Sequence, residues 1–194
     1  MSGADDAELH AAAIESLERR ILDLALQRTR ATSGAIFLWD SKRKGLAIDF
    51  HVVEGVVVNV PAALLRRRTD GRPNGIALAC FDRREPYLAN ETRDDPNYAP
   101  YFQDVRSIAA APILYQGAAI GVISVSAKEP GAFRAEHIEE LVDLAASSTK
   151  FLRRAQLYRA SRDETGRPFL IKGLSPAWLL VEKQLERVAP TDAP

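Results

Sequence analysis

The sequence predicts an α+β fold in which a central antiparallel sheet carries the N- and C-terminal helices on one face. Apolar segments of strand length occur in two pairs, and a short polar turn joins the members of each pair, which is typical of antiparallel hairpins. Long helical patterns flank these pairs at both ends. Because the members of a pair are joined so closely, parallel strands with crossover helices are not expected.

The first helix is expected over residues 7–30, which contain neither Gly nor Pro. Its apolar residues recur at gaps of three and four and give the helix one narrow apolar stripe, formed by Ile14, Leu17, Ile21 and Leu24. Residues 1–6 are expected to be a flexible terminus.

Two hairpins supply the strands of the predicted sheet. The first joins residues 35–39 to residues 46–53, and the second joins residues 108–114 to residues 118–127.

The segment between the hairpins is less regular. Short helices are expected over residues 62–67 and 76–81, and a loop over residues 90–100, which contain two prolines. Residues 86–89 are expected to be a short edge strand, because Pro86 has no N–H to donate to a central ladder.

The second long helix is expected over residues 134–162. Its small and apolar residues step by three and four as in a heptad seam, which is formed by Ile138, Leu141, Ala145, Ser148, Leu152 and Ala155. Residues 163–170 are expected to be a linker. Residues 171–194 are expected to begin a further domain, with a helix capped by Ser175.

The composition is that of an ordinary globular protein and excludes several classes. The 194 residues include 26 Lys and Arg and 26 Asp and Glu, so the formal net charge is zero, whereas a protein that binds nucleic acid mainly by charge is basic. The one cysteine can form neither an internal disulfide nor a Cys-rich zinc site. The N-terminus does not resemble a secretory signal, and no apolar run reaches about 18 residues. We therefore expect a cytoplasmic protein with no direct nucleic-acid or membrane partner.

The sequence contains no recognisable catalytic or metal-binding motif. His10, His51 and His137 lie in three different predicted elements, so neither a metal site nor a nucleophile–base pair is expected, and the chain is not expected to be an enzyme. Cys80 leaves two interpretations open. It is either a buried, inert side chain or, with Arg83 nearby to favour the thiolate, a redox or metal-binding group.

Three stretches resemble the GAF domain family, whose members are small sensory modules related to PAS domains. They are residues 32–40, residues 75–98 with the sequence Asp-Pro-Asn-Tyr at their end, and residues 107–125 followed by Phe133. The resemblance spans residues 7–162. It implies a GAF/PAS-like fold with terminal helices packed on one face of a twisted antiparallel sheet, and a ligand cavity on the other face under the middle helices and loops.

GAF domains bind cyclic nucleotides, bilins, haem, iron or small organic acids, and some bind nothing. Cyclic GMP is disfavoured here, since Lys128 and Phe133 match the family's signature for it but Ala127 and His137 do not. A bilin is disfavoured because Phe81 rather than His follows the cysteine, and the family's methionine-sulfoxide-reducing enzymes need two cysteines. Iron held by Asp and Cys side chains would lack His partners. The resemblance therefore assigns no cofactor.

Polar or aromatic side chains occupy the positions where GAF cavities lie. From the resemblance we expect the ligand-binding residues to be Cys80, Arg83, Asn90, Asp94, Tyr98, Phe102 and Ser107. The alternative is a ligand-free dimerisation or protein-interaction module, whose cavity is filled by its own side chains.

The last residues resemble a second family. Residues 171–178 and 186–194, which end in Val-Ala-Pro-Thr-Asp-Ala-Pro, are similar to the start of the AAA+ domain of sigma-54-dependent transcription activators, just before the Walker A loop. This resemblance implies a regulatory domain followed by the truncated start of an AAA+ ATPase domain, which would be its partner in the full-length protein.

The two helical stripes also predict a homodimer, whose contacts would come from Ile14, Leu17, Ile21, Leu24, Ile138, Leu141, Ala145 and Leu152. In this hypothesis a ligand favours one packing of the helices, and the second helix transmits that choice to the ATPase. The alternative is that both stripes pack on the chain's own sheet.

Overall fold

The computed structural model describes residues 3–58, 63–100 and 104–160, and its elements follow the predicted order of helix, hairpin, irregular segment, hairpin and helix. The helices are α1 (Gly3–Thr29), α2 (Ile76–Arg83) and α3 (Ala135–Ala160), with a short 3-10 turn, η1 (Thr92–Asp94). The strands are β1 (Ser33–Asp40), β2 (Gly45–Val53), β3 (Val56–Val57), β4 (Leu64–Leu65), β5 (Tyr87–Ala89), β6 (Ser107–Tyr115) and β7 (Ala118–Ala127).

The described strands form one antiparallel sheet of seven strands in the order β3-β2-β1-β7-β6-β5, and β4 also pairs with β2. The predicted α+β class and both predicted hairpins, β1–β2 and β6–β7, are therefore confirmed. β1 and β7 form the centre and bring together two segments that are distant in the sequence, with Ala35 opposite Ser124 and Phe37 opposite Val122. β5 lies at the edge, as predicted from Pro86.

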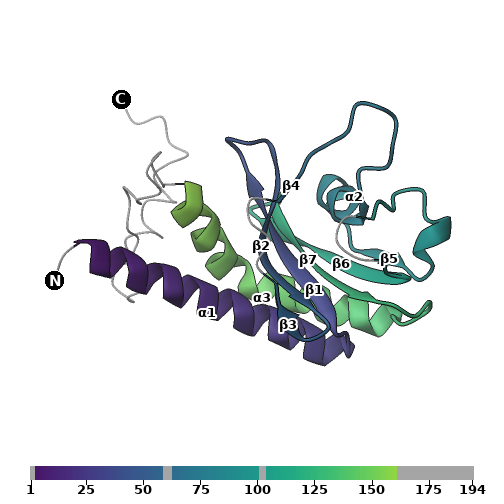
Figure 1. Cartoon of the computed structure of the whole chain (residues 1–194), viewed down its shortest axis with the longest axis horizontal. Coiled ribbons are helices and arrows are strands. Elements are labelled where there is room, and N and C mark those ends of the chain that lie inside the picture. The colour runs from purple at the N-terminus through teal and green to yellow at the C-terminus, as the bar shows by residue number, and fades with distance from the viewer. Residues whose placement is uncertain (1–2, 59–62, 101–103, 161–194) are drawn as a thin grey trace.

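Helices cover both faces of this sheet (Figure 1). α1 and α3 lie on one face, where Ile36 and Leu38 of β1 and Ile123 of β7 enter the same core as the two helices. α2 lies on the other face, where Leu78 and Cys80 pack in a separate core. The strand periodicity of two separates these sets of side chains, because successive residues of a strand point to opposite faces.

Gly121 permits the close approach of β1 and β7 at the centre of the sheet. A Cβ atom at this position would lie 2.2 Å from the backbone oxygen of Phe37 and 2.9 Å from the side chain of Leu38. The backbone cannot move away without breaking the ladder, so this position requires glycine.

A β-bulge interrupts β2 at Asp49. Ile36 pairs with Phe50 and the next residue, Phe37, pairs with Ile48, so Asp49 is left without a partner in the register. An extra residue of this kind turns a strand locally and changes which face its side chains meet. Phe50 accordingly packs in the core beneath α1 and α3, whereas Ile48 packs on the α2 side.

The structure differs from the sequence-based prediction at two places. The predicted short helix over residues 62–67 was wrong, because Leu64 and Leu65 form β4 opposite Ala47 and Leu46. Pairing with the free edge of β2 buries Leu65 to 3% exposure, which outweighs the local preference for a helix. α1 also begins at Gly3, four residues before the predicted start of the first helix, and the predicted flexibility of residues 1–6 stays a prediction.

Much of the two helical stripes packs within the chain itself. Ile21, Leu141, Ala145 and Leu152 are each at most 6% exposed and belong to the core between α1, α3 and the sheet. Ile14, Leu17 and Ile138 are partly buried against the same core, and Leu24 is 41% exposed. Packing on the chain's own sheet, the alternative that the sequence left open, thus accounts for four of the eight residues predicted to form the homodimer, and a homodimer stays a prediction.

Over the described parts of the chain, the helices lack the combination of length and apolar character that crossing a membrane requires. The predicted linker over residues 163–170 and the predicted start of a further domain over residues 171–194 lie outside the described residues.

Candidate functional site

A cavity lies on the α2 side of the sheet. Its volume is about 90 Å³, and the described residues that line it come from β1, β2, β4, α2, β6, β7 and the loop before β6. They are Gly34, Ala35, Phe37, His51, Leu65, Gly75, Ile76, Ala77, Tyr98, Ala99, Val105, Ile108, Ser124 and Ser126. The sheet forms the floor of the cavity, and α2 and the loop form walls above this floor that leave the cavity partly open.

Small residues on the sheet leave room for the cavity. Ser124 and Ser126 of β7 face it, while Val125 between them fills the core beneath α1 and α3. On β1, Ala35 lines the cavity opposite His51 of β2. The alternation at this end of β7 therefore places an apolar side chain on the helix face and small polar ones on the cavity face.

The described lining of the cavity carries polar groups but includes no Lys, Arg, Asp or Glu. Burial lowers the pKa of the His51 imidazole, which favours its neutral form at neutral pH. The hydroxyl of Tyr98 is buried and makes no hydrogen bond with any described residue. A buried hydroxyl without a partner is unfavourable, so this oxygen opposes folding of the ligand-free domain.

Tyr98 is held in place by a turn that the Asp-Pro-Asn-Tyr sequence forms. The backbone N–H of Tyr98 donates to the backbone oxygen of Asp95 at 3.1 Å, and the N–H of Asn97 donates to the Asp95 carboxylate at 2.8 Å. The hydroxyl of Tyr87 on β5 donates to the same carboxylate at 3.0 Å and accepts from the Asn97 amide at 2.7 Å. Tyr87 thus fastens to the edge of the sheet the turn that presents Tyr98.

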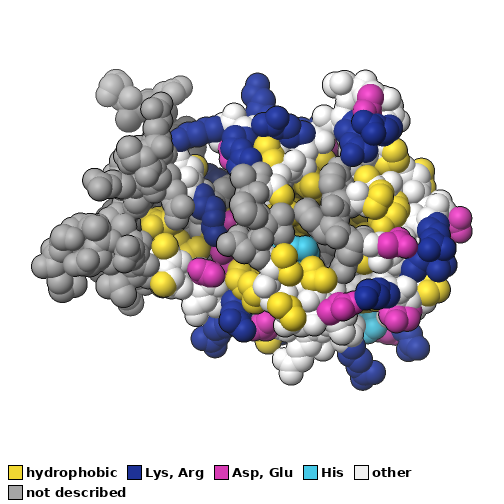
Figure 2. Space-filling model, in the orientation of Figure 1, with side chains coloured by type: hydrophobic (Ala, Val, Ile, Leu, Met, Phe, Trp, Pro, Cys, Tyr) yellow, Lys and Arg dark blue, Asp and Glu magenta, His cyan; other side chains and the backbone are white. Residues whose placement is uncertain are grey.

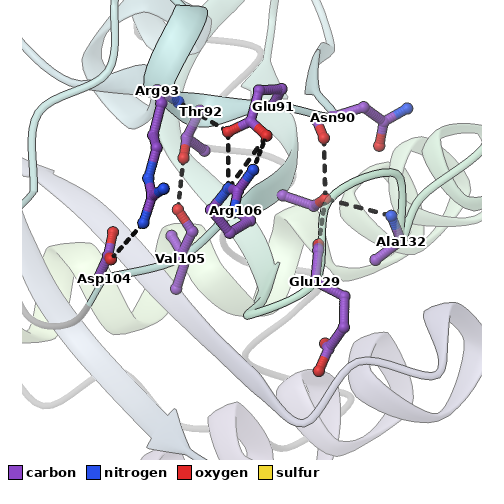
Figure 3. Close-up of polar contacts among 10 residues, drawn as sticks. Asn90, Glu91, Thr92, Arg93, Asp104, Val105, Arg106, Glu129 and Ala132 are labelled. Atoms are coloured by element: carbon purple, nitrogen blue, oxygen red, sulfur yellow. Dashed lines mark hydrogen bonds and ion pairs between the residues drawn. The ribbon is translucent and has the colours of Figure 1, made fainter.

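A second polar network joins the segment around η1 to the residues just before β6 (Figure 3). The Arg106 guanidinium donates to both carboxylate oxygens of Glu91, and this contact lowers the pKa of Glu91 to about 2. The Thr92 hydroxyl donates to the backbone oxygen of Val105, which lines the cavity. The network therefore holds Val105 against the sheet from η1.

The structure places Tyr98 of the predicted ligand-binding residues in the lining of the cavity. Phe102 lies outside the described residues. Cys80 lies in α2 with no exposure, and burial raises its pKa to about 12, so the thiol keeps its proton. Arg83 stacks over the ring of Tyr87 at 5.5 Å, and Asp94 lies in η1.

Asn90 and Ser107 lie away from the cavity lining and join β5 and β6 to the segment that follows β7. Asn90 donates from its amide to the backbone oxygen of Phe133 at 2.9 Å, and its amide oxygen accepts from the Phe133 N–H at 3.3 Å. The Ser107 hydroxyl donates to the backbone oxygen of Glu129 at 2.7 Å and accepts from the N–H of Ala132 at 3.2 Å. These contacts give both residues a structural role.

His51, Ser124 and Ser126 are lining residues that the sequence analysis did not select. The available signal was their position: polar residues at alternate positions of otherwise apolar strands point to the face that is not filled by core side chains. The described residues also include no cluster of three or more His, Cys, Asp or Glu side chains that could hold a metal ion.

A largely buried ionic cluster, in which only the Arg159 side chain is 35% exposed, lies on the opposite face of the sheet and joins three elements. Arg159 near the end of α3 donates from both terminal nitrogens to the Glu18 carboxylate of α1, each at 2.8 Å. Its third nitrogen, Nε, lies 2.6 Å from the Asp49 carboxylate in the β2 bulge. The side chains of Glu18 and Asp49 are each 2% exposed.

The cluster holds two carboxyl groups and one guanidinium. Burial, together with a side-chain contact to Glu18, raises the pKa of Asp49 well above its ordinary value, although Arg159 acts in the opposite direction. The Oδ2 atom of Asp49 accepts no hydrogen bond from any described residue. A proton on Asp49 would supply a donor toward Glu18 and leave one carboxylate paired with one guanidinium.

The family comparison matches the GAF domain to residues 11–150 of the chain. Among curated proteins, none matches the chain.

Solved structures share the fold at low sequence identity. A methyl-accepting chemotaxis protein fragment, residues 122 to 287, is 20% identical with a TM-score of 0.58, covering 74% of this chain and 90% of that one. The GAF domain of a two-component sensor histidine kinase from Bacillus halodurans is 14% identical with a TM-score of 0.57, covering 74% of this chain and 95% of that one. The free methionine-R-sulfoxide reductase from Neisseria meningitidis is 18% identical with a TM-score of 0.52, covering 80% of this chain and 96% of that one. The same fold thus occurs in a domain of a sensor protein and in a reductase. The fold by itself therefore does not decide between a sensing and a catalytic role.

Proposed function

Because this chain belongs to the GAF domain family, we propose that it is a signal-sensing regulatory domain that binds a small molecule in the cavity beneath α2. In this proposal the domain controls the adjacent AAA+ ATPase of a sigma-54-dependent transcription activator. The observation that carries it is the partly open cavity on the α2 side of the sheet, whose described lining combines apolar walls with the polar side chains of His51, Ser124 and Ser126.

β2 connects the cavity with the side of the domain from which a signal would leave. His51 lines the cavity on one face of β2, and Asp49, two residues earlier, contacts Arg159 of α3 on the other. A ligand that shifts β2 would therefore change the packing of the C-terminal end of α3, beyond which the chain continues. This is a population shift between two packings of the helices, biased by the ligand.

The link to an AAA+ domain is supported by the sequence of the last residues, 171–194, which resembles the start of that domain. A cytoplasmic location follows from this role as part of the proposal.

We propose a binding role and not an enzymatic one. Cys80 is the chain's one cysteine, and burial raises its pKa to about 12, so the thiolate that a nucleophile requires is not formed at neutral pH. The lining of the cavity, within the described residues, contains no acid beside a base that would suggest proton transfer.

The second candidate function is a ligand-free dimerisation module. The small size of the cavity, about 90 Å³, favours this alternative, since drug-sized ligands occupy roughly 300–1,000 Å³. Exposed apolar side chains on the long helices, Leu24 at 41% and Phe151 at 47%, offer surface for a partner.

Native mass spectrometry of the purified chain separates the two candidates. If the domain senses a ligand, the wild-type chain will carry an additional small mass, and Ala77→Leu, which places a larger side chain in the cavity, will lose it. Ala79→Leu on the same helix is the matched control, because Ala79 does not line the cavity. In the full-length protein, Ala77→Leu should alter ATPase activity. A wild-type chain without extra mass, together with unchanged ATPase activity in Ala77→Leu, would favour the dimerisation module.

A further inference from the structure

A groove lies on the helix side of the sheet, where the β1–β2 turn meets the last turns of α3 (Figure 1). We call it the α3-end groove. Its polar lining comes from the turn and from α3, and consists of Asp40, Ser41, Lys42, Arg153, Gln156 and Arg159. We propose that this groove binds the phosphate group of a small molecule through Lys42 and Arg153. The site is separate from the cavity beneath α2, and the inference does not depend on the proposed sensing function.

Arg153 is held in place by contacts that leave its charge without an acidic partner. Its guanidinium donates to the side-chain oxygen of Gln156 at 2.5 Å, and its central carbon lies 5.6 Å from the centre of the Tyr115 ring. Gln156 is itself fixed, because its amide donates to the backbone oxygens of Trp39 at 2.7 Å and Ile120 at 3.2 Å. Arg153 pairs with no carboxylate among the described residues. A cation that is already positioned loses less conformational freedom when it binds an anion.

Lys42 is the second cation of the groove that has no acidic partner. It is exposed in the β1–β2 turn and forms no ion pair with any described residue. The acid of this turn, Asp40, is engaged by Arg43, whose backbone N–H donates to the carboxylate at 2.9 Å and whose guanidinium lies 3.9 Å from it. The turn therefore leaves the ammonium of Lys42 for a ligand.

The inner wall of the groove is part of the ionic cluster of α1, β2 and α3. Asp49 and Arg159 line the groove, and Glu18 pairs with Arg159 from α1. Burial raises the pKa of Asp49, so the two carboxyl groups together carry one negative charge, which the guanidinium balances. The positive charge that remains unbalanced in the described lining is that of Lys42 and Arg153, and it matches a dianion.

This charge favours a phosphate over a carboxylate. A phosphate monoester carries about −1.5 to −2 at neutral pH, because its second pKa is about 6, whereas a carboxylate carries one negative charge. The planar guanidinium of Arg153 offers a fork of donors to phosphate oxygens, and the ammonium of Lys42 is a mobile point charge. Ala119 and Leu157 in the same lining supply apolar surface for the remainder of an ester.

The surroundings of the groove add positive potential. Arg43 and Lys44 follow Lys42 in the turn, and Arg66 follows β4, which pairs with β2 directly after this turn. Residues 41–48 and 63–69 contain no Asp or Glu. Figure 2 shows Lys and Arg side chains along the margin of the molecule above the turn. Because the chain as a whole has no net charge, this is a local excess, and it raises the concentration of anions near the groove.

The test is calorimetric titration of the full chain at pH 7, since Ala160 also lines the groove and the chain continues from there. The probes are phenyl phosphate, inorganic phosphate and benzoate, a monoanion with the same ring. We expect phenyl phosphate to bind at least tenfold more tightly than benzoate. Tighter binding of phenyl phosphate than of inorganic phosphate would identify an ester as the ligand, and equal binding would identify free phosphate. Both results support a phosphate site.

Substitutions separate the groove from the general charge of this end of the molecule. Lys42→Gln and Arg153→Gln should each weaken the binding of phenyl phosphate about tenfold, as expected when a hydrogen bond between charged groups is lost. Lys44→Gln is the matched control. It removes the same charge from the same turn, but Lys44 does not line the groove, so binding should weaken less than about twofold. Thermal unfolding confirms that each variant is folded.

Amide hydrogen exchange gives a second readout, because bound phenyl phosphate should slow exchange in the last turn of α3. The inference is overturned if phenyl phosphate does not bind, if its binding persists in both Lys42→Gln and Arg153→Gln, or if Lys44→Gln weakens it as much as they do. Benzoate that binds as tightly as phenyl phosphate would contradict the phosphate class. These results do not bear on the cavity beneath α2, and Ala77→Leu should leave phenyl phosphate binding unchanged.

Discussion

Tyr98 and Tyr87 lie on either side of one turn, but their hydroxyl groups meet different surroundings. The Tyr98 hydroxyl is buried without a partner among the described residues, whereas the Tyr87 hydroxyl contacts Asp95 and Asn97. An unsatisfied buried hydroxyl opposes folding, and a satisfied one supports it. The stability of the ligand-free domain should therefore respond in opposite directions to the loss of these two oxygen atoms.

We expect Tyr98→Phe to raise the free energy of unfolding of the ligand-free chain by about 1 kcal/mol, and Tyr87→Phe to lower it by a similar amount. Urea denaturation followed by circular dichroism measures both. Equal destabilisation by the two substitutions would show that the Tyr98 hydroxyl is satisfied in the free protein.

Asp49 is the second residue whose surroundings predict a measurable effect. Its pKa is raised by burial and by Glu18, so the folded state holds a proton that the unfolded chain has already released. Between the ordinary pKa and the raised one, the folded protein binds more protons than the unfolded one. Stability therefore falls as the pH rises through this interval, with a slope of at most about 1.4 kcal/mol per pH unit from this group.

Asp49→Asn removes this titration and keeps a side chain that can donate a hydrogen bond to Glu18. The difference in unfolding free energy between Asp49→Asn and the wild type should move in favour of the variant as the pH rises from 4 to 8. Urea denaturation at several pH values measures this difference. A constant difference across the range would mean that Asp49 has an ordinary pKa in the folded protein.

At the scale of single elements, the central pair β1–β7 leaves no room for a side chain at Gly121. Gly121→Ala would place a Cβ atom 2.2 Å from the backbone oxygen of Phe37, within the hydrogen-bonded ladder. Overpacking of a rigid core costs about 1–3 kcal/mol or more. We expect at least about 2 kcal/mol of destabilisation by urea denaturation, and less than about 0.5 kcal/mol for Ala118→Ser, at an exposed strand end. Similar small effects for both would show that the strands can separate at Gly121.

The elements that the sequence predicted correctly are those whose signal is local. Periodicity over many residues indicated α1 and α3, and apolar runs around short turns indicated the two hairpins. β4 was missed because two residues carry no periodicity, and its strand geometry depends on pairing with Leu46 and Ala47 of β2. The bulge at Asp49 likewise depends on the register against β1.

The candidate site was harder to predict than the fold, because a cavity is defined by which faces of distant strands meet. Tyr98 could be selected because its turn has a sequence signature. His51 and Ser124 could not, since their common face is fixed by β1 lying between β2 and β7. Asn90 and Ser107 were selected for their polarity, which the structure uses for hydrogen bonds to backbone groups instead.

At the scale of the whole molecule, the sheet separates two regions with different roles. The α2 side contains the uncharged cavity, and the other side contains the long helices with the buried cluster of Glu18, Asp49 and Arg159. On the face seen in Figure 2, apolar side chains gather in its central part and Lys and Arg side chains lie mainly along the margins. A signal that travels from cavity to helices must therefore cross the sheet, and β2 contacts both regions.

The helix side also offers a surface on which the predicted homodimer can be tested. Two stripe residues that are only partly buried, Ile14 and Leu17, line a hollow between α1 and α3 together with Phe151, whose exposed fraction is 47%. Leu24, which is 41% exposed, does not line this hollow. A large apolar side chain at the rim of an apolar hollow favours association with a second copy, because burial of its surface is worth roughly 25 cal/mol per Å². Leu141 is fully buried and does not line this hollow, so it is unavailable for this contact.

If the domain dimerises through this surface, Phe151→Gln will shift it to a monomer without unfolding it, because the side chain contributes to association more than to the core. Sedimentation velocity at tens of micromolar measures the state, and thermal unfolding checks the fold. Leu114→Gln is the matched control, since Leu114 is 41% exposed on β6 and does not line the hollow. A wild-type chain that sediments as a monomer, or a Phe151→Gln variant that remains a dimer, would remove this surface as the basis of signalling, and the coupling would then have to act within one chain through Asp49 and Arg159.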